Sequence, residues 1–115
     1  MIFSNDALKT IFNSCQDLES IITWDAYGCR RELLKTVAKY SPKNFHELKL
    51  MYFQLFPDVL ESFLIEWKNR TSKKSLSLIT NMSLEEESEK IIEKYKNLGI
   101  IKNFEVRGLD DEVYI

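Results

Sequence analysis

Apolar residues recur at three- and four-residue steps in the first 40 residues, which is the period of amphipathic helices. One stripe predicts a helix that begins after Ser4 or Asn5 and continues to Ile22. A second stripe predicts a helix that ends at Ser41-Pro42, because the residue before a proline disfavours helical backbone. The stripes consist of Ala7, Leu8, Ile11, Phe12, Cys15, Leu18 and Ile22, and of Leu33, Leu34, Val37 and Ala38.

The next segment, 44–56, is rich in aromatic residues. Asn44 and Glu47 have the spacing of a capping box, so we expect a helix over 44–56. Its apolar residues point in nearly every direction, which favours a central place in the core and leaves docking of a partner as the alternative. Pro57 fits the first turn of a further helix, whose buried face consists of Val59, Leu60, Phe63, Leu64 and Trp67.

A capped acidic helix follows in the last third of the chain. Ser83 and Glu86 form a second capping box, and Gly99 provides a left-handed cap at the other end. The apolar stripe of this helix is narrow, and it consists of Leu84, Ile91, Ile92, Tyr95 and Leu98.

Two further segments have the two-residue period of strands. Residues 76–80 alternate in this way, and so do residues 100–106, after which 108–111 can turn the chain into 113–115 as a hairpin. The expected fold is therefore mainly α (α+β), a single compact helix-rich domain over 1–115. It has four to five bundle-like helices and a small C-terminal antiparallel sheet of two or three strands.

The composition is that of a globular domain, with 115 residues of which 44% are hydrophobic and 30% charged. The first residues lack the positive and apolar regions of a signal peptide, so we expect a cytoplasmic protein. No apolar run approaches the roughly 20 residues that cross a bilayer, which excludes a membrane span. Cys15 and Cys29 are too few for a disulfide scaffold, and we expect them to be small core residues.

Little in the sequence indicates catalysis. His46 is the only histidine and falls at the start of the helix expected over 44–56, so no nucleophile–histidine arrangement is evident. Two cysteines and one histidine do not make a convincing zinc site, and three isolated glycines do not make a phosphate-binding loop. We therefore expect no enzyme, no cofactor and no metal.

Charge is distributed unevenly along the chain. Residues 83–115 hold nine carboxylates against five Lys or Arg, a net charge of −4, whereas residues 1–82 have a net charge of +2. Carboxylates in the first turn of a helix interact favourably with its dipole, but several together repel one another. The acidic third is therefore either a solvated face or a surface for a basic partner.

This profile of a small, slightly acidic, helix-rich cytosolic chain without a catalytic set resembles the immunity proteins of bacterial polymorphic toxin systems, including those of contact-dependent growth inhibition. The resemblance lies in size and composition alone. It implies a toxin inhibitor that acts by protein–protein interaction, occluding the active site of a cognate toxin domain, a basic nuclease. No small-molecule substrate and no membrane partner is implied. The residues that we expect to contact the partner are Glu85, Glu86, Glu87, Glu89, Glu93, Tyr95, Phe104, Asp110, Asp111, Glu112 and Tyr114.

The alternative is a small nucleic-acid-binding regulator of winged-helix type. Its phosphate contacts would come from a basic cluster of Lys68, Arg70, Lys73 and Lys74, which otherwise is a solubilising connector. The helix that would enter the groove of DNA is acidic in its first turn, which disfavours nucleic acid as a partner.

Overall fold

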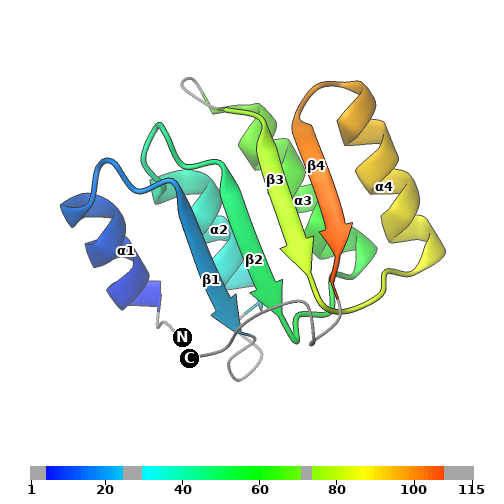
Figure 1. The fold of residues 1–115 in the computed structure, drawn as a ribbon, viewed down its shortest axis with the longest axis horizontal. Helices are drawn as coiled ribbons and strands as arrows, with labels where there is room; N and C mark the ends of the chain where they lie inside the picture. The colour runs from blue at the N-terminus through cyan, green and yellow to red at the C-terminus, as the bar shows by residue number, and fades with distance from the viewer. Residues whose placement is uncertain (1–4, 25–29, 71–73, 108–115) are drawn as a thin grey trace.

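Helices alternate with strands along the chain (Figure 1). The computed structural model describes residues 5–24, 30–70 and 74–107. In chain order the elements are α1 Asn5–Ser14, β1 Ser20–Trp24, α2 Arg30–Tyr40, β2 Glu47–Met51, α3 Pro57–Lys68, β3 Leu76–Thr80, α4 Glu86–Asn97 and β4 Ile101–Val106.

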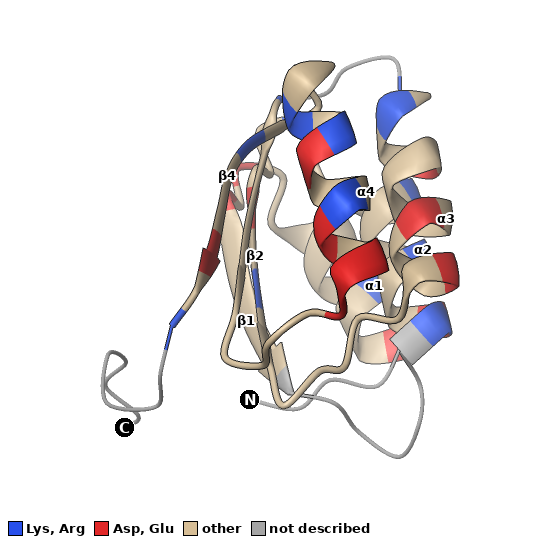
Figure 2. Cartoon of the chain, turned by 90° about the vertical axis from the view of Figure 1, so that its right-hand side faces the viewer, with Lys and Arg blue, Asp and Glu red and all other residues tan. Residues whose placement is uncertain are grey.

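The four strands form one parallel sheet in the order β1-β2-β3-β4. All four helices lie on the same side of this sheet, so its other face is not covered by any described element (Figure 2). The expected helical bundle with a C-terminal antiparallel sheet is therefore wrong, and the fold is α/β. The helices α2, α3 and α4 each serve as the crossover that a parallel strand pair requires, whereas α1 precedes the first strand.

Two of the strands were mistaken for parts of helices. The helix expected to continue to Ile22 ends at Ser14, and β1 follows it. The helix expected over 44–56 is the strand β2 with irregular chain on both sides. A short apolar strand that packs into a core matches several positions of a helical stripe, which is why periodicity did not separate the two.

The remaining elements agree better with the sequence pattern. The helices expected around Leu33–Ala38, after Pro57 and before Gly99 are present as α2, α3 and α4, and the strand over 76–80 is β3. The capping box expected from Ser83 and Glu86 is wrong. The helix α4 begins at Glu86, its N-cap residue is Glu85, and the Glu85 side chain forms no hydrogen bond to the helix backbone. Gly99 has a φ of 77°, as a left-handed cap requires.

The expected strand around 100–106 is β4, but it pairs in parallel with β3 rather than in a hairpin. Residues 108–115, which were expected to complete the hairpin, lie outside the described part of the chain. Because β4 has one described neighbour, it forms an edge of the sheet (Figure 1).

The core lies between the sheet and the helix layer. Leu48 and Leu50 of β2 are fully buried in it, as are Leu76 and Leu78 of β3. Three aromatic rings from different segments pack in it, with Phe45 lying 5.5 Å from Phe12 and 6.3 Å from Trp67 between ring centroids. The Trp67 indole also donates a hydrogen bond to the Lys74 carbonyl, which fixes the start of β3 against α3. Cys15 is exposed and does not belong to this core, contrary to the expectation, and Cys29 lies outside the described residues.

Candidate functional site

A groove lies beside the edge strand, between α4 and β4. It encloses about 390 Å³ and is lined by Ser83, Leu84, Glu89, Ile92, Glu93, Lys96, Phe104 and Val106. The turn after β3 contributes the first two of these residues, α4 the next four and β4 the last two. The groove is therefore built by segments that adjoin one another only because β4 returns along α4.

The groove has an apolar floor and a largely acidic rim. Phe104 and Val106 fall on the helix-facing side of β4, because they pair in register with the buried Leu78 and Thr80. Phe104 is partly buried against the core, whereas Val106 remains 48% exposed. An exposed valine next to a hollow at a sheet edge is the type of apolar surface that a partner can cover.

Carboxylates gather in the first turn of α4, and lysines in its last turn (Figure 2). Glu86 is paired with Lys90 at 3.7 Å. Within the described chain, no ion pair involves Glu85, Glu87, Glu89 or Glu93, and all four are exposed. The helix dipole accounts for one or two acidic residues near an N-terminus. The additional unpaired carboxylates leave a negative potential over the groove.

The structure brings together only some of the partner-contacting residues expected from sequence. Glu89, Glu93 and Phe104 line the groove, and Glu85, Glu86 and Glu87 lie exposed at the start of the same helix. Tyr95 is only 3% exposed and belongs to the core, so it is not accessible as a surface anchor. Asp110, Asp111, Glu112 and Tyr114 lie outside the described residues.

Five lining residues were missed as contact residues, and they are Ser83, Leu84, Ile92, Lys96 and Val106. Leu84 and Ile92 were interpreted as part of a purely internal stripe. The alternation of Phe104 and Val106 in the sequence did place them on one face of a strand. What the sequence did not show is that this strand lies at an edge of the sheet, since strand order depends on pairing between distant segments.

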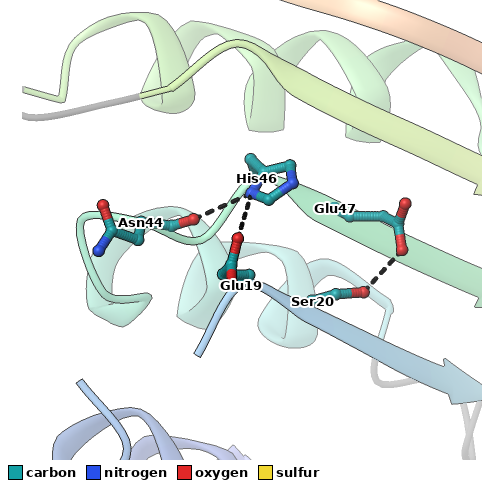
Figure 3. Close-up of polar contacts among 5 residues, drawn as sticks. All are labelled: Glu19, Ser20, Asn44, His46 and Glu47. Carbon is teal, nitrogen blue, oxygen red and sulfur yellow. Dashed lines mark hydrogen bonds and ion pairs between the residues drawn. The ribbon is translucent and has the colours of Figure 1, made fainter. Parts of the chain in front are cut away.

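A second group of polar side chains lies at the amino ends of β1 and β2 (Figure 3). Nδ1 of His46 is 3.0 Å from the Asn44 carbonyl oxygen and 4.0 Å from a Glu19 carboxylate oxygen. Next to it, the Ser20 hydroxyl donates to the Glu47 carboxylate at 2.8 Å. His46 is therefore on the loop that enters a strand, rather than in the first turn of a helix.

The uncovered face of the sheet carries charges that are largely engaged with one another. Glu105 accepts hydrogen bonds from Asn103 and Arg107, and these two donors together with the positive charges of Arg107 and Lys49 hold the pKa of its carboxyl below its usual value. Ile79 lies between Lys49 and Glu105 in the strand register and is 2% exposed. This face therefore presents polar pairs instead of an apolar docking surface.

Of the basic cluster, Lys73 lies outside the described residues, and Arg70 is engaged within the fold. The Arg70 guanidinium donates to the hydroxyl and carbonyl oxygens of Ser41, the carbonyl at 2.6 Å, and lies 4.5 Å from the centre of the Trp67 ring. Burial lowers the pKa of Arg70 from its usual value. Arg70 thus closes the C-terminal end of α2 in the fold, and its guanidinium is already occupied by these contacts.

The described residues contain no group of three or more His, Cys, Asp or Glu arranged to hold a metal ion. No helix among them is long and apolar enough to pass through a bilayer.

Comparison with known proteins gives no relative. No family model matches the chain, and no curated protein or solved structure matches it either. A functional assignment therefore depends on the side chains described above.

Proposed function

We propose that this chain is a binding protein that neutralises a basic protein partner at the groove between α4 and β4. The resemblance to toxin-immunity proteins suggests the kind of partner, a nuclease toxin domain whose substrate-binding surface is positively charged. The observation that carries the proposal is the groove itself, in which an apolar floor adjoins unpaired carboxylates at a sheet edge.

The mechanism is occlusion, without a chemical step. Glu89 and Glu93 pair with Lys or Arg of the partner and take the place of substrate phosphates there. An apolar side chain of the partner covers Val106 and Phe104, and such a buried anchor provides most of the binding free energy in typical interfaces. The acidic rim mainly raises the association rate and selects against acidic proteins.

Two features of the structure weaken the winged-helix alternative. Its two-stranded wing required an antiparallel pairing of β4, whereas β4 pairs in parallel with β3. Its phosphate contacts included Arg70, which is bound to the end of α2. Nothing in the described part of the chain favours nucleic acid over a protein as the partner of the groove.

Co-expression with the product of the neighbouring upstream gene tests the proposal. We expect that product to be toxic alone, and we expect this chain to rescue growth and to co-purify with it. The double variant Glu89→Lys/Glu93→Lys should lose rescue and binding. Asp17→Lys/Glu66→Lys, which changes the net charge equally at exposed positions outside the groove, should keep both.

A complex that forms equally well with both double variants would overturn the groove as the interface. An upstream product that is neither toxic nor bound would overturn the immunity role as applied to that gene pair. Circular dichroism of each variant separates loss of binding from loss of fold.

A further inference from the structure

A second hollow lies at the amino ends of the strands, at the opposite end of the sheet from the turn that connects β3 to α4. It encloses about 360 Å³ and is lined by His46, Lys74, Ser75 and Lys102. These residues come from the amino ends of three adjacent strands, β2, β3 and β4. The parallel order brings together three nitrogen-bearing side chains that are at least 28 residues apart along the sequence.

Both lysines of this hollow are exposed, and neither forms an ion pair with a carboxylate in the described parts of the chain. By contrast, Lys90 and Lys94 on α4 are paired with Glu86 and Glu61. Two ammonium groups on one small hollow repel each other, so the site gains free energy when an anion lies between them.

His46 provides a third contact with a defined orientation. Its Nδ1 lies within hydrogen-bonding distance of the Asn44 carbonyl, which only accepts, so Nδ1 carries the proton. Nε2 is on the opposite side of the ring, away from Asn44 and Glu19 (Figure 3). Of the two nearby carboxylates, Glu19 lies on the Nδ1 side and Glu47 accepts from Ser20. No hydrogen bond or ion pair in the described chain joins Nε2 to either carboxylate, so Nε2 of a protonated imidazole can donate to an anion.

The geometry points to a binding site for a phosphate group at this hollow. Lysine is a common phosphate ligand in proteins, and a dianion balances the two ammonium charges. The Ser75 hydroxyl donates to the Gly99 carbonyl at 2.8 Å, which uses its one proton and leaves its lone pairs to face the solvent. The lining contains no aromatic ring other than the imidazole, so it offers no platform on which a nucleobase could stack. We expect recognition of the phosphate alone, as free phosphate or as a simple monoester.

The site is separate from the groove between α4 and β4, and no lining residue is shared between the two. Its occupation does not depend on the proposed partner. It can therefore be tested with the isolated chain.

Titration of the isotope-labelled chain with inorganic phosphate, glycerol 3-phosphate and acetate at constant ionic strength tests the site by NMR. We expect both phosphate compounds, and not acetate, to shift the amide signals of Ser75, Lys102 and His46. Lys74→Gln/Lys102→Gln should weaken binding by about tenfold or more, because it removes both ammonium groups that would contact the phosphate. The control Lys35→Gln/Lys90→Gln removes the same charge from the helix layer and should leave the affinity unchanged.

Binding of free phosphate but not of the ester would assign the site to the inorganic ion, and equal binding would assign it to phosphate groups in general. Equal weakening by both double variants, or shifts spread over all lysines, would overturn the proposal. A short single-stranded RNA that binds through Lys74 and Lys102 while neither phosphate compound does would also overturn it, in favour of a nucleic-acid backbone. His46→Gln provides an independent check under conditions in which the imidazole is protonated and Nε2 can donate. It removes this donor without changing the lysines, so it should then also weaken phosphate binding.

Discussion

At the scale of single residues, Thr23 stands out because its hydroxyl is buried and has no hydrogen-bond partner among the described residues. Leaving a polar group in this state costs roughly 1–3 kcal/mol, so Thr23→Val should raise the free energy of unfolding by about 1 kcal/mol. Thr80 is equally buried, but its hydroxyl accepts a hydrogen bond from the Met82 amide. Thr80→Val should therefore lower the free energy of unfolding by about 1 kcal/mol. Urea unfolding of the two variants measures the difference, and equal shifts for both would contradict this account.

Arg70 was a candidate for phosphate contact in the sequence, but in the structure it stabilises the fold by binding Ser41. Its hydrogen bonds to the end of α2 predict that Arg70→Ala lowers the free energy of unfolding by about 2 kcal/mol, with Arg70→Lys in between. Arg31 is the matched control, because its ion pair with Asp58 is exposed and contributes at most about 1 kcal/mol. Thermal and urea unfolding measure both, and a cost at Arg70 no larger than at Arg31 would show that the capping bonds are dispensable.

Glu105 gives the stability of the chain a dependence on acid pH. In the folded chain, hydrogen bonds from Asn103 and Arg107 lower the pKa of its carboxyl below the ordinary value of 4.5. The charged form therefore contributes its full stabilisation to the fold at pH values above that ordinary pKa. This contribution is lost as the pH falls through the lower, folded pKa. Glu105→Gln should therefore be less stable than the parent chain at neutral pH, and the two should converge on acidification. Urea unfolding at a series of pH values measures this, and a constant difference at all pH values would contradict it.

At the scale of elements, the end of α4 is set by its backbone conformation. The amide of Ile100 bonds to the Tyr95 carbonyl and that of Gly99 to the Lys96 carbonyl, which is the Schellman pattern. A Cβ added at Gly99 would meet no atom within 4 Å, so Gly99→Ala tests the positive φ alone. It should cost about 1 kcal/mol in unfolding free energy, and Gly99→Asn less. The exposed Leu98, changed to Ala, provides the control. A Gly99→Ala variant as stable as the parent would show that the cap is not required.

The elements also show where sequence patterns are sufficient and where they are not. The helices α2, α3 and α4 could be predicted because each keeps an apolar stripe over three turns and has a Pro or Gly signal at one end. The strands β1 and β2 have only five residues each, and β1 contributes Ile22 to what reads as the end of a helical stripe. Phe45 and Phe53 flank β2 and are buried by tertiary packing, so they extended its apolar pattern well beyond the strand.

For the candidate site, the acidic half of α4 and the face of Phe104 could be predicted, because both depend on local spacing. The edge position of β4 and the burial of Tyr95 could not, because both depend on which strands and helices become neighbours. The hollow at His46, Lys74 and Lys102 was not predicted for the same reason. Its lining residues lie in three separate segments, and only the parallel strand order places them together.

At the scale of the whole molecule, the sheet order contains no reversal. Ligand crevices of open α/β sheets form where the strand order reverses and adjacent helices lie on opposite faces. Here the order runs from β1 to β4 with every helix on one side, so the described fold offers no such crevice (Figure 1). This leaves the edge groove and the amino-end hollow as the places where the described chain is best able to meet a ligand or partner.

The charge distribution of the molecule leads to a kinetic prediction for the proposed complex. The unpaired carboxylates over the groove attract a basic partner before contact, and such attraction is screened once the ionic strength shortens the Debye length to about 10 Å or less. Raising the salt from about 20 to about 200 mM should therefore slow association by roughly tenfold and leave dissociation nearly unchanged. Stopped-flow mixing with the purified partner measures both rates. Glu89→Lys/Glu93→Lys should flatten the dependence, whereas Asp17→Lys/Glu66→Lys should keep most of it. If salt acted on dissociation instead, the carboxylates would be buried contacts of the final complex, and long-range steering would not be their role.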